Sequence, residues 1–382
     1  MATNYRGFRQ NDGTEHQWLD KGNPYRAKSL ALAHYFADEE GKDLLYTTCI
    51  DMGGGTSDIS IWVGNRLIHQ CSVQIAGRLL FSQFWKNRPD FLNQQFNTDL
   101  SDLSSSLRDE PFFVKLDGLL AAEGSKWLER NRTLMDDDPD LQTIVQLSTL
   151  GISGLYYYIG LVLRALDIEE KYTRKLNTPV YIGGNGSRIL NWLDLSGRFS
   201  PDCETSLLFS RLLSKASGFE NKKEPTVLSS KPKAEVACGL VLDQNVTRLT
   251  GLQDDDEVIF AGEDCEVNGE AFGWQDRLDL TQFQKIESFK LVGSDDEEVG
   301  LANLQKFLED FQQAFKELKI TSIKPLRQYD DEQWRNSLWT NVKRSVESNL
   351  TNLEGRNSED VRVEPPFILG LKALLKELNS RL

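Results

Sequence analysis

Short apolar runs along the chain predict a set of strands. Residues 44–50 (LLYTTCI), 59–63 (ISIWV) and 66–75 (RLIHQCSVQI) are rich in β-branched and aromatic residues. Gly64-Asn65 is a tight hairpin turn between the second and third runs, so we expect an antiparallel meander. Residues 180–182 (VYI) predict one more buried strand.

Apolar residues at helical spacing predict the other elements. The helix at residues 234–242 contains mostly small residues, which favour close packing. Beyond residue 300, Phe311, Phe315, Trp334 and Leu338 belong to apolar stripes that are more typical of a core than of an interface. The expected helical regions are residues 26–36, most of 77–167, a helix from about 189, 234–242, and three patterns after 300.

The composition changes near residue 245. Acidic runs at 254–257 and 295–298 flank two strand-like pieces and are typical of solvated loops. We therefore expect a first unit of residues 1–245, with a helical insertion at about 77–150. The second unit, residues 246–382, is an acidic, strand-containing linker followed by a helical module.

Charge and cysteine usage exclude several classes of protein. The chain has 44 basic and 58 acidic residues, a formal charge of −14, which disfavours nucleic acid as the main partner. The most apolar stretch, residues 151–167, is shorter than the ~20 residues of a membrane span. Five widely spaced cysteines without a CxxC pair predict neither a disulfide framework nor a zinc site. We expect a cytoplasmic protein without a membrane or secretory segment.

The strand at residues 44–50 runs into a triple-glycine turn, Asp51-Met-Gly-Gly-Gly-Thr-Ser-Asp58. Glycines let backbone approach a ligand closely and present N–H donors to an anion. Asp51, at the end of a buried strand, is suited to holding Mg²⁺ through water, and Thr56 to contacting a terminal phosphate. A glycine-rich hairpin with a capping aspartate is the alternative.

A second glycine turn, Gly183-Gly-Asn-Gly-Ser-Arg188, follows the strand at residues 180–182. Such a turn admits a nucleotide against bare backbone, and the guanidinium of Arg188 can stack on a base. Short turns of this kind are also common without a ligand. The GxxxxGK[ST] pattern of a P-loop is missing from the sequence.

Together the two turns resemble motifs of the actin-like ATPase superfamily, which includes heat-shock chaperone ATPase domains, sugar kinases and actins. Residues 51–60 (DMGGGTSDIS) resemble its second phosphate-binding motif, and residues 180–188 (VYIGGNGSR) its adenosine motif. The helices at 29–35 and 234–242 are similar to the connecting and closing helices of the chaperone branch. The resemblance covers residues 25–243 and implies a ribonuclease-H-like α/β lobe.

The resemblance also implies roles for individual residues. Gly53, Gly54, Gly55 and Thr56 would cradle the β- and γ-phosphates of ATP, and Asp51 would orient hydrated Mg²⁺. Asp58 belongs to the same motif. Gly183, Gly184, Asn185 and Arg188 would bound the adenosine pocket. Glu123 and Lys126 are candidates for contacts to the nucleoside, although charged pairs on a helix are more often simply exposed.

The family's site has a second half, a strand and D-x-G-[TS] loop from a first lobe. The motif at residue 51 leaves no room for that half, so we expect the second lobe of an ATPase, encoded as a fragment, a truncated product or a subunit completed by another chain. Phosphoryl transfer needs groups on both sides of the phosphate, and we expect little hydrolysis by this chain alone. A non-catalytic scaffold that binds a protein partner through the lobe and C-terminal helices remains an alternative. A small-molecule kinase is less favoured.

Overall fold

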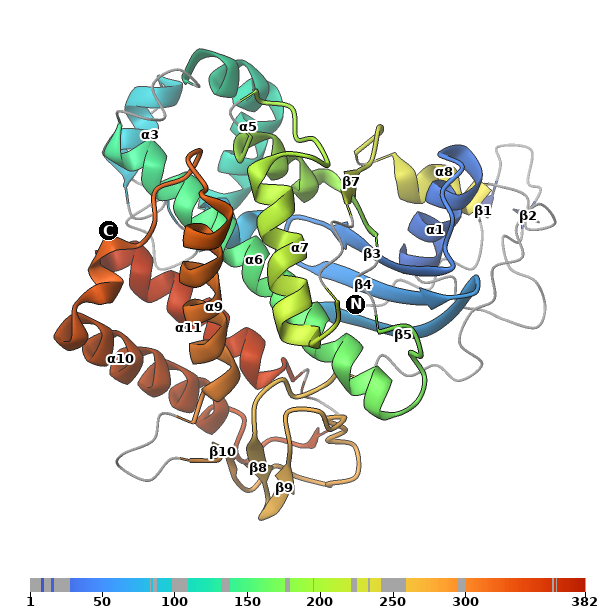
Figure 1. Cartoon of the computed structure of the whole chain (residues 1–382), viewed down its shortest axis with the longest axis vertical. Helices are drawn as coiled ribbons and strands as arrows, with labels where there is room; N and C mark the ends of the chain where they lie inside the picture. The colour runs from blue at the N-terminus through green and yellow to red at the C-terminus, as the bar shows by residue number, and fades with distance from the viewer. Residues whose placement is uncertain are drawn as a thin grey trace.

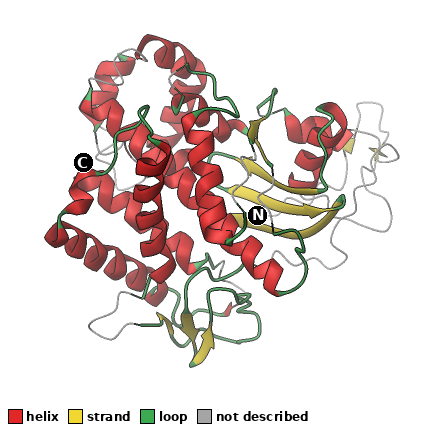
Figure 2. Cartoon of the chain, in the orientation of Figure 1, coloured by secondary structure: helices red, strands yellow, loops and turns green. Residues whose placement is uncertain are grey.

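The computed structural model describes residues 8–9, 15–16, 28–82, 84, 88–97, 109–131, 138–175, 179–194, 196–220, 225–232, 234–241, 259–293, 300–358, 361 and 363–381. Within these ranges the chain has a mixed α/β fold, in which helices surround a mixed sheet (Figure 2). The α/β class predicted from the sequence is therefore confirmed. The expected boundary near residue 245 and both acidic runs lie outside the described residues.

The main sheet has five strands in the described part of the chain, in the spatial order β5-β4-β3-β6-β7. β3, β4 and β5 pair antiparallel, as the predicted meander requires, whereas β6 joins β3 in parallel and β7 joins β6 in parallel. The bounds are β3 Tyr46–Met52, β4 Ser57–Val63, β5 Arg66–Val73, β6 Val180–Gly183 and β7 Thr226–Leu228.

Both faces of the sheet are buried, because successive side chains of a strand point to opposite sides. Cys49 of β3 and Tyr181 of β6 pack in one cluster with α1 (Lys28–His34). Their neighbours Ile50 and Ile182 pack on the other side in the main core, which contains α6 (Pro139–Ile168). Two separate cores therefore hold the sheet between two helical layers (Figure 1).

The helical layers differ in size. The smaller layer contains α1, the π-helical turn η1 that continues it, and α8; the larger contains α6 and α7, with α3 and α5 beyond them (Figure 1). The bounds are η1 Tyr35–Glu39, η2 Arg78–Ser82, α3 Pro89–Phe96, α5 Asp109–Asn131, α7 Glu204–Ser217 and α8 Glu235–Val241. A pair of two-residue strands, β1 Phe8–Arg9 and β2 Glu15–His16, is separate from the main sheet.

Helix α6 is the central helix of the core. It begins at Pro139, and the Asp138 carboxylate caps it by accepting the N–H groups of Asp140 and Leu141 at 2.9 and 3.1 Å. The helix is longer than the apolar stretch noted in the sequence, and it is long and apolar enough to cross a membrane. However, 94% of its most apolar window is buried inside the protein, as in a core helix of a soluble protein.

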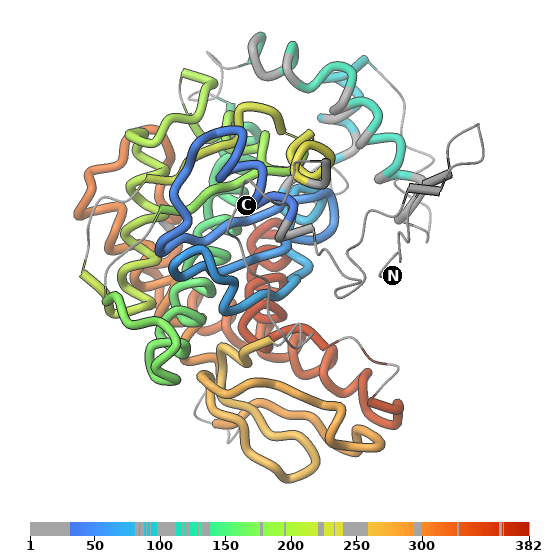
Figure 3. The backbone as a smooth tube through the Cα atoms, turned by 90° about the vertical axis from the view of Figure 1, so that its right-hand side faces the viewer, coloured from blue at the N-terminus to red at the C-terminus, as the bar shows by residue number. Residues whose placement is uncertain are grey.

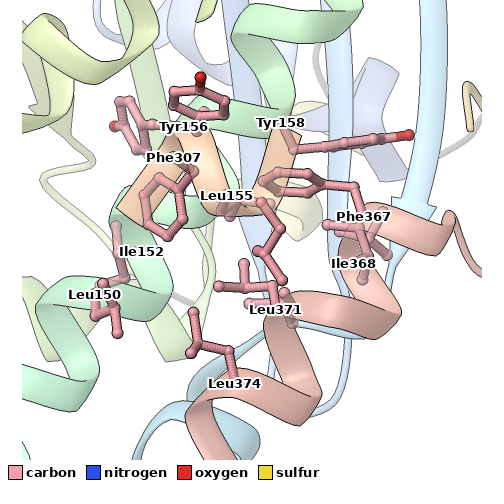
Figure 4. Close-up of a cluster of buried hydrophobic side chains, with 14 of the residues drawn as sticks. Leu150, Ile152, Leu155, Tyr156, Tyr158, Phe307, Phe367, Ile368, Leu371 and Leu374 are labelled. Atoms are coloured by element: carbon pink, nitrogen blue, oxygen red, sulfur yellow. The ribbon is translucent and has the colours of Figure 1, made fainter. Parts of the chain in front are cut away.

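The C-terminal region packs against α6 and α7 rather than forming a detached bundle. Phe367 and Leu371 of α11 share one core with Leu155 and Tyr158 of α6 and with Phe307 of α9 (Figure 4). A small antiparallel sheet, β10-β8-β9, lies at the end of this region (Figure 3). The bounds are β8 Cys265–Val267, β9 Glu270–Phe272, β10 Phe289–Leu291, α9 Ala302–Leu318, η5 Arg327–Asp330, α10 Glu332–Thr351 and α11 Pro366–Arg381.

The apolar stripes of the C-terminal helices are therefore core, as their spacing indicated. Phe311, Phe315 and Leu338 are buried, and Trp334 is half-buried against the same core. Glycines bring the layers into contact. A Cβ atom on Gly262 would lie 2.7 Å from the Cβ of Phe367. The loop before β8 and helix α11 are therefore in close contact at this glycine. Such contacts depend on residues far apart in the sequence.

Candidate functional site at the two glycine turns

The first glycine turn, residues 53–56, connects β3 to β4. The N–H of Gly53 donates to the carbonyl oxygen of Thr56 at 2.8 Å and closes the turn. Gly54 and Gly55 are exposed, and a Cβ atom on either would meet no atom within 4 Å. The backbone at these two residues therefore faces open space, as backbone that binds an anion must.

The segment that follows β5 returns to this turn and supports it. Gly77 and Arg78 donate their N–H groups to the carbonyl oxygens of Gly53 and Gly54 at 3.3 and 2.8 Å. The hydroxyl of Ser57 donates to the carbonyl oxygen of Ile75 at 2.5 Å. These contacts fix the turn and carry a cationic residue, Arg78, to its side. This segment was not predictable from the sequence, because the contacts are made by backbone atoms and leave no residue pattern.

The second glycine turn begins where β6 ends, at Gly183. Gly184 has a φ of 81°, in the left-handed region that favours glycine, and its carbonyl oxygen accepts both the N–H and the Oγ of Ser187 at 3.2 and 2.7 Å. A 3₁₀ helix, η4 (Asn185–Trp192), follows at once. The helix predicted from about residue 189 is therefore present as a 3₁₀ helix, but it begins earlier, at Asn185, because the glycine turn is itself the first helical turn.

The structure brings the two turns together at one edge of the sheet. Asp51 and Gly183 are partners in the parallel β3–β6 ladder. A Cβ atom on Gly184 would lie 2.8 Å from the backbone carbon of Met52, and one on Gly186 would lie 2.9 Å from its oxygen. Gly184 and Gly186 thus allow the backbones of the two turns to touch. Their lack of side chains serves this contact and creates no open space for a ligand.

Two carboxylates stand beside the first turn. Asp51 and Asp58 are directly opposite in the antiparallel β3–β4 ladder, so their side chains leave the sheet on the same face. This is the face that α1 covers, because Asp51 lies two residues after Cys49. Asp51 is only 9% exposed, and Asp58 accepts a hydrogen bond from the Ser72 hydroxyl at 2.6 Å. Like charges placed so closely favour a nearby cation.

Glu235 of α8 is a third carboxylate at this edge, and it is not among the site residues predicted from the sequence. It is fully buried, and its Oε1 accepts the N–H of Gly184 at 3.0 Å. Its Oε2 has no hydrogen-bond partner within the part of the chain that the structure describes. The sequence contains one feature that could have pointed to Glu235: it is an acidic residue within a predicted helix of mostly small apolar residues.

Helix α8 holds Glu235 in place by packing tightly on α1. A Cβ atom on Gly239 would overlap the backbone of Ala31, including its Cα at 3.1 Å, so the two helices are in direct contact. The prediction that this small-residue helix packs closely is confirmed. The same layer is tied to the loop before α8 by the Tyr35 hydroxyl, which lies 3.0 Å from Ser230 Oγ and donates to Glu40 at 3.0 Å.

The remaining predicted site residues lie at the rim of the second turn. Asn185 and Arg188 are exposed, and Arg188 donates from Nη2 to the carbonyl oxygen of Pro232 at 3.4 Å. This bond links the second turn to the loop that precedes α8. Arg188 is therefore an exposed residue at the surface of the turn.

Glu123 and Lys126 form an ion pair with each other on α5, at 3.7 Å, and the Lys126 side chain is 71% exposed. The helix itself lies close to the second turn. Trp127 stacks on Trp192 of η4 with ring centroids 4.5 Å apart, and Phe96 of α3 stacks on Trp127 from 5.8 Å. The structure therefore places α5 beside η4, but it gives no contact between the charged pair and the glycine turns.

No group of three or more His, Cys, Asp or Glu side chains suited to holding a metal ion occurs among the residues searched, which are those the structure describes. A cation bound through water to Asp51 does not require such a group. No protein-family model matches this chain, and a comparison with curated proteins gives no match either. Functional inference therefore comes from the geometry of this site and from the motifs.

Proposed function

We propose that this chain binds the phosphate groups of ATP, together with Mg²⁺, at the two glycine turns. One observation carries the proposal. The two turns, about 130 residues apart in sequence, meet at one edge of the sheet, and the backbone of Gly54 and Gly55 is open there. In this assignment Gly53, Gly54, Gly55 and Thr56 surround the phosphates.

The strand order supports assignment to a ribonuclease-H-like, actin-type lobe. If the five strands β3 to β7 are numbered 1 to 5 in chain order, their order in the sheet is 3-2-1-4-5. Strand 2 (β4) runs antiparallel to strand 1 (β3), whereas strand 4 (β6) runs parallel to it. The three-stranded meander and the parallel strand β6 agree with the arrangement expected from the resemblance, and β7 adds a second parallel strand that was not predicted from the sequence. Ligands of open α/β sheets commonly bind at the carboxyl ends of parallel strands, where Asp51 and Gly183 lie.

The chemistry of the carboxylates supports the choice of Mg²⁺. Asp51 and Asp58 would repel a polyphosphate unless a cation lay between them and the ligand. Hydrated Mg²⁺ commonly keeps several waters and uses one or two carboxylates plus phosphate oxygens. When bound, the ion would neutralise phosphate charge; Asp51 would accept hydrogen bonds from its waters, and Asn185 and Arg188 would border the nucleoside.

We further propose that this chain binds nucleotide in the cytoplasm and is a poor ATPase alone. All five cysteines, Cys49, Cys71, Cys203, Cys238 and Cys265, are free thiols, which agrees with a reducing compartment. Efficient phosphoryl transfer positions the attacking water and stabilises charge on both sides of the phosphate. The turns supply one side, and a first lobe or another chain would supply the other.

Titration calorimetry with Mg-ATP tests the binding proposal. Gly54→Val places a side chain in the open space of the first turn, and we expect roughly tenfold weaker binding or more. Gly118→Val is the matched control, since Gly118 is also exposed with no atom within 4 Å of a Cβ. Its affinity should equal that of the wild type. Equal affinities for wild type and Gly54→Val, or no binding by the wild type, would show that the turn is only a hairpin.

A further inference from the structure

A row of three polar side chains crosses the main sheet beside the first glycine turn. Asp58 on β4 is directly opposite Asp51 on β3, and on its other side it is directly opposite Ser72 on β5. Side chains that are directly opposite in a ladder leave the sheet on the same face, with Cβ atoms about 4.5–5.5 Å apart. Asp58 therefore lies between a like charge on one side and a hydroxyl group on the other.

The hydroxyl of Ser72 holds one oxygen of the Asp58 carboxylate. Ser72 Oγ donates to Asp58 Oδ1 at 2.6 Å. This length lies in the range of about 2.5–2.7 Å that is typical of an O–H donor to an ionised carboxylate, and such bonds are roughly twice as strong as those between neutral groups. Because β5 and β3 lie on opposite sides of β4, Ser72 binds Asp58 from the side away from Asp51.

The other oxygen of Asp58 is available to a ligand. Within the part of the chain that the structure describes, Oδ2 of Asp58 accepts no hydrogen bond. It is also not one of the buried unpartnered polar atoms of these residues, and Asp58 is half-buried, so solvent reaches this oxygen. Mg²⁺ bound beside a carboxylate usually keeps several of its waters, and Oδ2 can accept a hydrogen bond from one of them.

We propose that Ser72 is a positioning residue of the nucleotide site, which orients Asp58 so that its Oδ2 faces the water shell of Mg²⁺. This inference rests on the proposed function and deepens it, because it names a residue outside both glycine motifs that determines how the cation is held. The carboxylates of Asp51 and Asp58 repel each other, so without the hydroxyl the Asp58 side chain would rotate away from Asp51. The hydrogen bond from Ser72 prevents that rotation.

Calorimetry with ATP, in Mg²⁺ and separately in EDTA, tests this role. Residues that orient a metal-binding group typically contribute about 10–100-fold to metal affinity, so we expect Ser72→Ala to weaken Mg-ATP binding roughly tenfold. Its ATP affinity in EDTA should equal that of the wild type, and Ser72→Thr, which keeps the hydroxyl, should restore Mg-ATP binding. Thr281→Val is the matched control, because the Thr281 hydroxyl also donates to a carboxylate at 2.6 Å, that of the exposed Asp279 between β9 and β10. It should bind Mg-ATP like the wild type.

A double-mutant cycle separates an action through Asp58 from an independent effect. Asp58→Asn should also weaken Mg-ATP binding, and adding Ser72→Ala to it should cause little further loss, because the hydroxyl then has no carboxylate to orient. Three results would each overturn the role of Ser72: equal Mg-ATP affinities of Ser72→Ala and the wild type, equal losses in Mg²⁺ and in EDTA, or additive losses in the double variant. Mg-ATP binding that is lost in Gly54→Val would meanwhile leave the proposed function intact. Absence of Mg-ATP binding by the wild type would overturn both.

A measurement on the wild-type chain serves if the variants do not fold. Mn²⁺ prefers the same oxygen ligands as Mg²⁺, and as a paramagnetic ion it broadens the amide NMR signals of nearby residues. With ATP present, the signals of Asp58 and Ser72 should broaden at lower Mn²⁺ concentrations than that of Arg66, which lies at the other end of β5, about 20 Å away. Equal broadening of Ser72 and Arg66 would overturn the placement of the cation beside this row.

Discussion

Alanine at Gly186 and alanine at Gly54 should have opposite effects on stability, although both glycines belong to apparently similar turns. A Cβ on Gly186 would overlap the carbonyl oxygen of Gly53 and lie 2.9 Å from that of Met52. Both are backbone atoms at the end of a central strand, so neither can move like a flexible side chain. A Cβ on Gly54 would meet nothing within 4 Å, and its φ lies outside the left-handed region.

The magnitudes follow from these two environments. Adding a methyl group to a well-packed contact typically costs about 1–3 kcal/mol, because backbone must shift to admit it. We expect Gly186→Ala to lower the free energy of unfolding by that amount. Gly→Ala in a compatible conformation stabilises by about 0.4–1 kcal/mol by restricting the unfolded chain. Gly54→Ala should therefore be as stable as the wild type or slightly more so.

Urea denaturation followed by tryptophan fluorescence measures both effects, since the chain has 8 tryptophans. The midpoint should fall for Gly186→Ala and stay or rise for Gly54→Ala, with similar slopes for both. Equal midpoints would refute the close contact between the two turns. A larger loss for Gly54→Ala than for Gly186→Ala would show that the first turn is the packed one and is not open to a ligand.

Three further predictions concern the core and the activity. Burial raises the pKa of Glu263 from 4.5 to about 8. Between these pH values the folded chain binds one more proton than the unfolded chain, so the free energy of unfolding should fall as the pH rises from about 4.5 to about 8. Glu263→Gln should make the urea midpoint less dependent on pH in this range. Phe367→Ala should cost about 3–5 kcal/mol in the same assay, because Phe367 is fully buried in the core shared by α6 and α11. A phosphate-release assay should show little turnover by the chain alone; robust Mg²⁺-dependent turnover that is lost in Asp51→Ala would contradict this.

Local pattern was sufficient to predict the elements of the sheet. The β-branched runs at β3, β4 and β5 are each bounded by glycine or asparagine, and their order along the chain dictates an antiparallel meander. The order of the motifs also predicted that the strand at residues 180–182 joins the same sheet in parallel, with Asp51 and Gly183 at the same end, and the β3–β6 ladder confirms this. Short-range periodicity and one long-range resemblance therefore positioned both turns.

Features that depend on tertiary contacts were not predictable in this way. The N–H of Arg78 donates to Gly54 and the carboxylate of Glu235 accepts from Gly184. Both partners are distant in the sequence, so no local pattern predicts these contacts. The start of η4 at Asn185 was missed because Gly184 continues directly into a helical turn. Likewise, helical spacing in α11 predicted a buried stripe but did not reveal α6 as the surface it covers.

The glycines of this chain have two different physical uses that a sequence motif does not distinguish. At Gly160 a Cβ would lie 2.7 Å from the Leu213 carbonyl oxygen, and Gly186 and Gly239 are similarly in contact with backbone, so these glycines allow elements to approach one another. At Gly54 and Gly55 the absent side chain leaves open space instead. A glycine that is required for packing gives no indication of a bound ligand. An exposed glycine with no packing role must be explained in another way, and close approach of a ligand to the backbone is one such explanation. The nucleotide binding that we propose would therefore depend on Gly54 and Gly55, and substitutions at these two residues test it without disturbing the fold.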